Sequence, residues 1–340
     1  MTSSPHMCHG EQPLGGISVA LRLSRFTRSL TILLAIVFGG LDLQAAESLQ
    51  SFLSHLMQEK QGAAIVSDPR TGRVLAICNP QTAFREAYPL GSTAKLVTSA
   101  AALEEGVITP AERILCRRVP RLLGESYHCT HPPPDQPFDL ATALANSCNY
   151  FFSEVSSRLS SSALAHWYAT FGFGVAGAGA PPGAVRIRDD AREKALAALG
   201  IEGVTATPAQ VLLAYSAIAT EGRVFRLMAP GHHPAPSLAR WVPLQKTTFA
   251  VLSEALRECV QNGMCQGAAV PGVAVAGKTG TAVALDGSRA THAWFVGYAP
   301  ADSPEVAVVV FLKRGTGGAN AAPLAGQILK QYFAEKARTP

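Results

Sequence analysis

The chain has 340 residues, of which 48% are hydrophobic and 16% are charged, and its formal net charge is +5 at pH 7. This balance is ordinary for a globular protein and excludes a wholly disordered chain, and the charge is too small for the basic footprint of a nucleic-acid-binding protein. The length favours one large domain or two interleaved subdomains.

Residues 1–46 have the pattern of a targeting segment rather than of a folded core. Arginines at positions 22, 25 and 28 precede an apolar run over residues 30–41, and the small residues Ala45 and Ala46 follow. The run is shorter than the roughly 20 residues that a membrane-spanning helix needs. We therefore expect an exported, periplasmic or otherwise extracytoplasmic protein, in which residues 1–46 are a signal peptide or, as the alternative, a retained membrane anchor.

In an exported protein, the cysteines that follow residue 46 could form disulfides. Two local pairs, Cys116 with Cys129 and Cys259 with Cys265, are plausible disulfides in an oxidising compartment. The complete connectivity cannot be deduced from the sequence, and isolated buried thiols are the alternative.

The rest of the chain, residues 47–340, contains both strand-like and helix-like patterns. Hydrophobic periodicity and turn residues predict, in chain order, a helix over 48–57, strands over 62–68 and 73–79, a helix over 92–105, an irregular stretch over 114–137, helices over 140–159, 208–220 and 248–260, strands over 273–278, 293–297 and 306–312, and a helix over 324–334. Strands at both ends and helices between them predict an α/β fold, in which a sheet flanked by terminal helices is interrupted by a helical subdomain at roughly 92–260. Ligands often bind where two such parts meet.

The first candidate for chemistry is Ser92, which follows the stretch from Pro89 to Gly91 and begins a predicted helix. A helix N-terminus offers unpaired backbone N–H groups and partial positive charge, which suit an oxyanion. Lys95 lies on the same helix face among apolar neighbours, where burial would make it a better base for a serine nucleophile. Taken alone, the Ser-x-x-Lys spacing is also compatible with a helix cap and an exposed lysine.

Two further polar stretches interrupt apolar surroundings. Ser147 and Asn149 lie within the predicted helix 140–159, where they could relay a proton and hold a substrate amide, and Cys148 between them is expected to pack as a small hydrophobic residue. Residues 277–281 lie at the end of a predicted strand, and their glycines permit close backbone approach while Lys278 and the threonine hydroxyls suit a carboxylate.

The three stretches in this order resemble the active-site motifs of the penicillin-binding transpeptidases, within the serine β-lactamase superfamily. The residues around 200–210 and 292–300 are similar to other parts of the same family. The resemblance extends over roughly residues 61–333 and implies the fold of that family, an antiparallel sheet flanked by the N- and C-terminal helices with an inserted all-helical subdomain.

The resemblance also implies catalytic roles. Ser92 would be the acylated nucleophile, Lys95 would take its proton, and Ser147 would link Lys95 to the leaving nitrogen. The backbone N–H groups of Ser92 and Thr281 would form the oxyanion hole, in which each donor is typically worth about 3 kcal/mol.

The remaining motif residues would bind substrate. Asn149 would contact the substrate amide, and Lys278 and Thr279, with Gly280 and Thr281, would bind the terminal carboxylate of a D-Ala-D-Ala stem peptide or of a β-lactam. The implied function is a serine D,D-transpeptidase of peptidoglycan biosynthesis that β-lactams acylate, with no cofactor and no metal.

Three alternatives stay open, because the first half-reaction is shared across the superfamily. They are a D,D-carboxypeptidase, a weak serine β-lactamase, and a β-lactam or muropeptide sensor that is acylated without turnover. Glu193 and Glu202 do not lie in the pattern of one β-lactamase class, and the second motif differs from that of another, so the transpeptidase is favoured. The acceptor substrate, protein partners and oligomeric state cannot be deduced.

A metal site is the last hypothesis that the sequence raises. Residues 128–131 contain two histidines around Cys129, which is compatible with zinc, but the stretch lacks a second clear pair of ligands. We therefore expect no metal.

Overall fold

The computed structural model describes residues 47–175, 183–229, 231 and 235–338. Its main element is a five-stranded sheet with the strand order β2-β1-β9-β8-β7, in which every neighbouring pair is antiparallel. The five strands are β1 (Gly62–Ser67), β2 (Val74–Cys78), β7 (Ala276–Val283), β8 (Thr291–Ala299) and β9 (Val306–Leu312). The α/β fold class with an antiparallel sheet built from both ends of the chain is confirmed.

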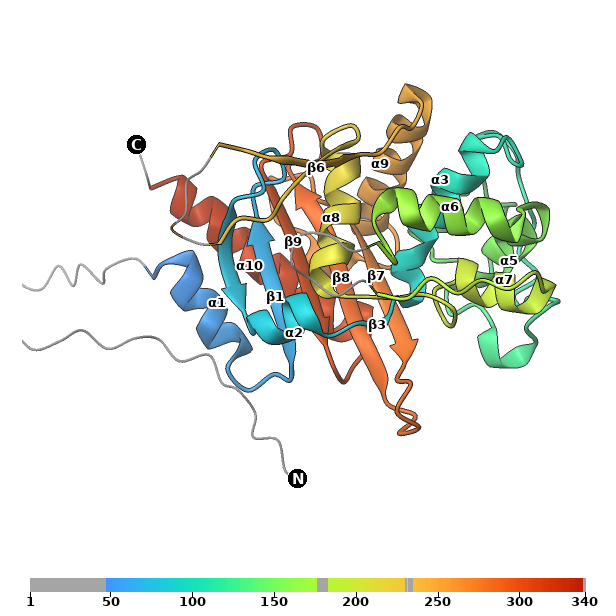
Figure 1. The fold of residues 1–340 in the computed structure, drawn as a ribbon, viewed down its shortest axis with the longest axis horizontal. Helices are drawn as coiled ribbons and strands as arrows, with labels where there is room; N and C mark the ends of the chain where they lie inside the picture. The colour runs from blue at the N-terminus through green and yellow to red at the C-terminus, as the bar shows by residue number, and fades with distance from the viewer. Residues whose placement is uncertain (1–46, 176–182, 230, 232–234, 339–340) are drawn as a thin grey trace, which may run out of the picture.

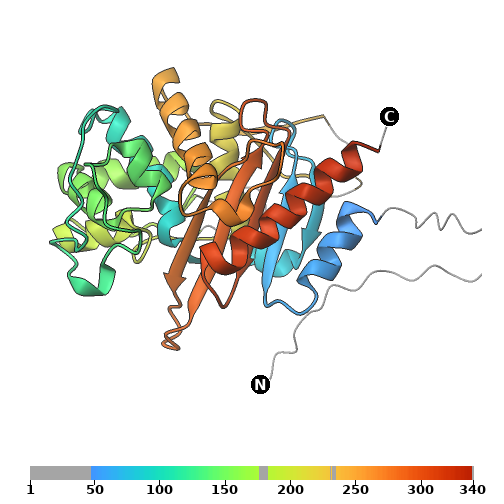
Figure 2. The ribbon, with the colours of Figure 1, turned by 180° about the vertical axis from the view of Figure 1, so that it is seen from behind.

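Helices cover both faces of the sheet and form a lobe beside it (Figures 1 and 2). The helices are α1 (Leu49–Met57), α2 (Pro80–Arg85), α3 (Lys95–Glu104), α4 (Leu140–Ala145), α5 (Asn149–Arg158), α6 (Ser161–Phe171), α7 (Ala191–Ala198), α8 (Pro208–Ala219), α9 (Lys246–Gln261) and α10 (Ala322–Lys336). The terminal helices α1 and α10 lie side by side on one face, α8 packs on the other, and α3, α5, α6 and α7 belong to the lobe. The strands β3 (Tyr88–Pro89) with β4 (Thr205–Ala206), and β5 (Arg223–Phe225) with β6 (Leu238–Trp241), form two small separate sheets.

The central strand β9 contributes to two hydrophobic cores, because successive side chains of a strand point to opposite faces. Val308 and Val310 pack with α1 and α10, whereas Val309 and Phe311 pack with α8 and the lobe. All seven residues of β9 are buried, which explains its uninterrupted apolar sequence.

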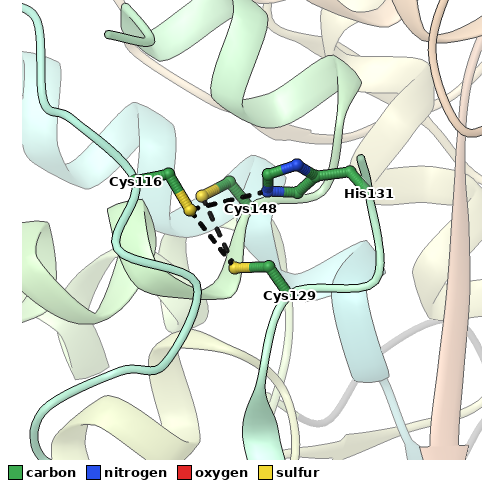
Figure 3. Close-up of side chains that lie close together, drawn as sticks. All are labelled: Cys116, Cys129, His131 and Cys148. Atoms are coloured by element: carbon green, nitrogen blue, oxygen red, sulfur yellow. Dashed lines mark hydrogen bonds between the residues drawn. The ribbon is translucent and has the colours of Figure 1, made fainter. Parts of the chain in front are cut away.

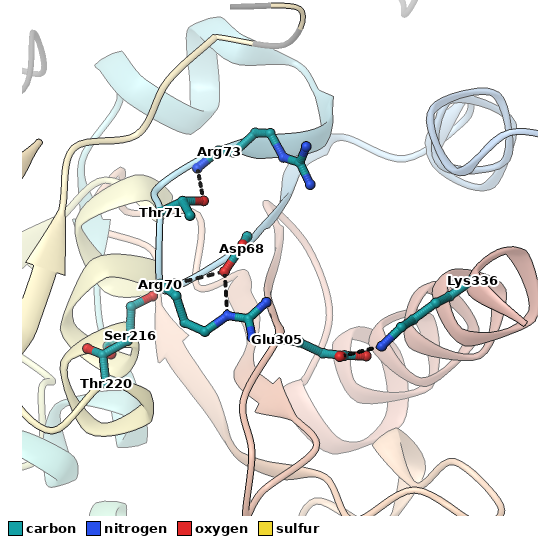
Figure 4. A network of polar contacts seen from close by, with 8 residues as sticks. All are labelled: Asp68, Arg70, Thr71, Arg73, Ser216, Thr220, Glu305 and Lys336. Carbon is teal, nitrogen blue, oxygen red and sulfur yellow. Dashed lines mark hydrogen bonds and ion pairs between the residues drawn. The ribbon is translucent and has the colours of Figure 1, made fainter. Parts of the chain in front are cut away.

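The turn between β1 and β2 is held by polar contacts (Figure 4). The carboxylate of Asp68 accepts hydrogen bonds from the backbone N–H of Arg70 at 2.9 Å and from its guanidinium Nε at 3.2 Å. Nearby, Lys336 at the end of α10 pairs with Glu305, which precedes β9. The first contacts hold the hairpin turn, and the second joins the terminal helix to the segment before β9.

The two predicted cysteine pairs have different outcomes. Cys259 and Cys265 form the expected disulfide at the end of α9, with an S–S distance of 2.06 Å. The prediction for Cys116 and Cys129 is wrong, because they are buried thiols whose sulfur atoms lie 3.7 Å apart. Cys129 also contacts the sulfur of Cys148, so these thiols are not isolated either.

The predicted signal peptide or anchor at residues 1–46 lies outside the described residues, and the boundary between residues 46 and 47 stays a prediction. Among the described residues, none of the helices has both the length and the apolar character needed to cross a membrane.

Candidate active site

Ser92 lies in a turn of 3₁₀-helix, η1 (Gly91–Ala94), that leads directly into α3. A 3₁₀-helix has three residues per turn, so the side chains of residues i and i+3 lie above one another. Lys95 follows Ser92 by three positions, and its Nζ lies 3.0 Å from Ser92 Oγ. Ser92 is partly exposed between buried neighbours.

Two buried hydrogen bonds from other elements fix the position of this turn. The indole of Trp294 on β8 donates to the carbonyl of Pro89 at 3.0 Å. The hydroxyl of Tyr215 on α8 donates to the carbonyl of Thr93 at 2.9 Å. The sheet and α8 therefore hold the backbone on both sides of Ser92.

Lys95 is completely buried and is the centre of a polar cluster. Besides Ser92, its Nζ contacts the Ser147 carbonyl at 2.7 Å, Ser147 Oγ at 3.2 Å and Asn149 Oδ1 at 2.6 Å. Burial lowers the pKa of Lys95 to about 8, because a desolvated ammonium is disfavoured. A substantial fraction of Lys95 is then neutral near physiological pH and can accept the proton of Ser92.

Ser147, Cys148 and Asn149 lie at the junction of two helices. The predicted single helix over 140–159 is wrong: α4 ends at Ala145 and α5 begins at Asn149. Ser147 has a φ of 57°, in the left-handed region, where a non-glycine residue cannot continue an α-helix. The break directs Ser147 and Asn149 to Lys95, and Cys148 becomes the N-cap of α5.

The contact of Asn149 with Lys95 was not anticipated from the sequence. Its Oδ1 accepts from Lys95, and its Nδ2 donates to the backbone carbonyl of Tyr127 at 3.1 Å. Asn149 therefore connects Lys95 to the irregular stretch before α4. No local pattern could have revealed this contact, since its partners come from three separate segments.

The third motif lies within the strand β7, which continues to Val283, so the predicted end of this strand at residue 278 is too early. Lys278 is completely buried, and its Nζ donates to the carbonyl of Thr279 at 3.2 Å. Burial, followed by the charge of Lys95, lowers the pKa of Lys278 well below its ordinary value. An anionic ligand beside Lys278 would favour its charged form.

Strand β7 and the turn of Ser92 approach each other so closely that glycine is needed on both. A Cβ at Gly91, whose φ is +53°, would lie 2.4 Å from the carbonyl oxygen of Thr281 and 3.0 Å from its nitrogen. A Cβ at Gly280 would lie 2.8 Å from the carbonyl oxygen of Leu90. The two chain segments that carry Ser92 and Thr281 are thus in direct backbone contact, as an oxyanion hole shared between them requires.

Comparison with known proteins identifies the family of the chain. Residues 62–330 match the family described as the penicillin binding protein transpeptidase domain. The chain is 25% identical to the peptidoglycan D,D-transpeptidase MrdA of Acinetobacter baumannii over 359 aligned positions, covering 86% of this chain and 53% of MrdA. It is 31% identical to stage V sporulation protein D of Bacillus subtilis, covering 73% of this chain and 42% of that protein. The chain therefore spans about half the length of these curated relatives.

Solved structures agree with the fold. The D,D-transpeptidase domain of a peptidoglycan glycosyltransferase from Eggerthella lenta superposes with a TM-score of 0.75 at 24% identity, covering 85% of this chain and 81% of that one. An imipenem acyl-enzyme complex of penicillin-binding protein A from M. tuberculosis superposes with a TM-score of 0.70 at 25% identity, covering 85% and 77% of the two chains.

Proposed function

We propose that this chain, which belongs to the penicillin-binding protein transpeptidase domain family, is a serine D,D-transpeptidase acting on peptidoglycan stem peptides that end in D-Ala-D-Ala. One observation carries the proposal above the others: a buried lysine of lowered pKa lies 3.0 Å from the hydroxyl of a partly exposed serine. That pair is the activated nucleophile that acyl transfer requires. β-Lactams, whose strained amide replaces the D-Ala-D-Ala peptide bond, would acylate the same serine.

Acylation begins when neutral Lys95 takes the proton of Ser92 Oγ and the oxygen attacks the carbonyl carbon of the penultimate D-Ala. The backbone N–H groups of Ser92 and Thr281 stabilise the resulting oxyanion. Collapse of the tetrahedral intermediate breaks the peptide bond. The proton on Lys95 passes through the Ser147 hydroxyl, 3.2 Å away, to the leaving nitrogen of the terminal D-Ala, and an ester remains on Ser92.

Deacylation transfers the acyl group from Ser92 to an acceptor amine. The amine attacks the ester carbonyl and loses a proton to Lys95 as the new amide forms, and Ser92 regains its hydroxyl proton from Lys95. Asn149 would orient the substrate amide from beside Lys95.

Strand β7 would bind the terminal carboxylate of the substrate. Lys278 supplies a positive charge when a carboxylate is bound, and Thr279 supplies a hydroxyl. Gly280 and Thr281 would let the ligand approach the backbone of the strand.

Transfer to an amine is favoured over hydrolysis by the position of the two acidic residues considered earlier. Glu193 pairs with Arg188 at 3.0 Å on the surface of α7, and Glu202 is exposed. Neither contacts Ser92 or Lys95, so neither is placed to activate a water for rapid deacylation.

The proposed location is outside the cytoplasm, where the substrate is found, with residues 1–46 as a signal peptide or anchor. The mass of the chain recovered from the expressing cells distinguishes the two, because only a signal peptide is removed.

The test is intact-protein mass spectrometry of the purified chain with benzylpenicillin over time. We expect a long-lived adduct on the wild type and on the exposed-serine control Ser157→Ala, and none on Ser92→Ala. Labelling of Ser92→Ala would remove Ser92 as the nucleophile, and absence of any adduct on the wild type would contradict the proposal. An adduct that disappears rapidly would favour a β-lactamase, and release of free D-Ala without cross-linking would favour a carboxypeptidase.

A further inference from the structure

Four side chains that play no part in the proposed reaction meet beside the second motif (Figure 3). They are Cys116, Cys129 and His131 from the irregular stretch before α4, and Cys148 from the N-terminus of α5. One ligand atom from each lies within 4.8 Å of every other. All four residues are at most 8% exposed, so the group is closed to solvent.

The spacing of the sulfur atoms is that of a shared ion rather than of a direct bond. Cys116 Sγ and Cys148 Sγ each lie 3.7 Å from Cys129 Sγ, and His131 Nε2 lies 3.7 Å from Cys116 Sγ. A disulfide would need about 2.05 Å. Tetrahedral Zn²⁺ with Zn–S bonds of about 2.3 Å places its sulfur ligands about 3.8 Å apart. The two sulfur–sulfur distances match the edges of that tetrahedron, and the remaining pairs of ligand atoms lie within 4.8 Å.

Each of the three sulfurs also accepts a hydrogen bond from a backbone N–H. The donors are Arg118 to Cys116 at 3.3 Å, Tyr150 to Cys129 at 3.3 Å and Phe151 to Cys148 at 3.4 Å. Such bonds favour the thiolate, which is the form that binds a metal.

His131 is also oriented to bind a metal. Its Nδ1 lies 2.7 Å from the carbonyl oxygen of Pro132, which can only accept a hydrogen bond, so Nδ1 carries the proton. The lone pair of Nε2 is then left on the side that faces Cys116. This outer hydrogen bond is the arrangement that normally fixes a metal-binding histidine.

We propose that Cys116, Cys129, His131 and Cys148 bind one Zn²⁺ ion in a closed tetrahedral site. Four protein ligands leave no open position, so the ion is structural rather than catalytic. Its binding displaces the thiol protons and joins the irregular stretch to the start of α5. The sequence-based expectation of no metal considered only residues 128–131, whereas two of the ligands lie outside that stretch, and the exposed His128 is not a ligand.

The proposed site adjoins the catalytic cluster through Cys148. Ser147 and Asn149, its neighbours on either side, both contact Lys95 Nζ. Asn149 also bonds to the carbonyl of Tyr127, two residues before Cys129. A metal that fixes Cys129 and Cys148 would therefore fix the left-handed turn at Ser147, so the ion acts as a positioning element for the active site.

The first experiment measures zinc bound to the purified full-length chain by elemental mass spectrometry. We expect one zinc per chain in the wild type and in the matched control His128→Ala, and loss of at least about nine-tenths of it in His131→Ala. Because a ligand variant can misfold, the apo protein is also prepared with a chelator and titrated with Zn²⁺ alone. A wild type that holds no zinc and does not bind it on titration, or zinc that persists in His131→Ala and in Cys116→Ser, would overturn the site.

The second experiment substitutes Co²⁺ for zinc. Tetrahedral cobalt with three thiolate ligands gives intense visible bands and a thiolate charge-transfer band, which weaken in Cys148→Ser if that residue is a ligand. An octahedral spectrum would contradict the geometry, as would peptide mapping that finds Cys116 disulfide-bonded to Cys129 in the native chain.

The link to the active site is tested on wild-type protein alone. Removal of zinc should slow acylation by benzylpenicillin about ten- to a hundredfold, the usual effect of losing groups that orient a site, and returning zinc should restore it. Unchanged acylation in zinc-free protein would overturn the positioning role. Zinc binding is measured without any enzymatic turnover, so the zinc site is tested independently of the proposed transpeptidase reaction.

Discussion

The two sides of the candidate active site each contribute a completely buried lysine, and the two lysines have different surroundings. Lys95, at the start of α3, contacts four oxygen atoms of Ser92, Ser147 and Asn149. Lys278, on β7, donates to the carbonyl of Thr279. Burial lowers the pKa of both, but Lys95 contacts the proposed nucleophile Ser92, whereas Lys278 bonds to a backbone carbonyl and is proposed to bind a carboxylate. Residue type and burial alone therefore do not assign a role, and the partners do.

The largest effect should follow from removing the base. Lys95→Ala should slow acylation by at least about a hundredfold with every substrate, because general-base catalysis typically contributes that much. Rates of penicillin and thioester acylation measure it, with the exposed-lysine variant Lys330→Ala as the control. Near-normal acylation at neutral pH would remove Lys95 from this role.

Replacement of the second lysine should discriminate between substrates. Lys278→Ala should slow acylation by carboxylate-bearing substrates about ten- to a hundredfold more than acylation by neutral thioesters, the size of a charge-assisted hydrogen bond. The same pair of substrates is compared in the wild type and in Lys330→Ala. Equal losses for both substrates would contradict a carboxylate-binding role.

The pH dependence should separate the two lysines further, with a smaller effect. If neutral Lys95, whose pKa is about 8, is the proposed base, acylation by a neutral thioester should rise with pH, by roughly tenfold between pH 7 and 9. Lys278 and the thiols of Cys129 and Cys148 also face this region, so the profile should be measured in Lys278→Gln as well. A profile that is flat over this range in both proteins would contradict the assignment of Lys95.

Short stretches of sequence were sufficient to find the three motifs, but not to predict how the folded chain brings them into contact. Each of the three motifs is contiguous, and the strand over 306–312 was recognisable because its apolar run is uninterrupted. The break between α4 and α5 was missed because residues 140–159 remain helical in pattern on both sides of Ser147, whose left-handed backbone has no sequence signal. The pairing of Cys259 with Cys265 was found from their short separation.

The group of Cys116, Cys129, His131 and Cys148 illustrates the opposite case. Its members are brought together by tertiary folding, and spacing along the chain made plausible a disulfide between Cys116 and Cys129, which are free thiols in the structure. Partners that meet only through the folded chain leave no periodicity to detect.

The alternation along β9 has a consequence for how the molecule unfolds. Strand β9 contributes residues both to the core beneath α1 and α10 and to the core beneath α8 and the lobe. If one core unfolds, the other therefore loses part of the packing on β9. We expect the described parts of the chain to melt as a single cooperative unit despite their lobed shape. Damage at α1 and α10 would then reach the turn of Ser92 through β9 and the indole of Trp294, which packs on Phe311 and bonds to Pro89.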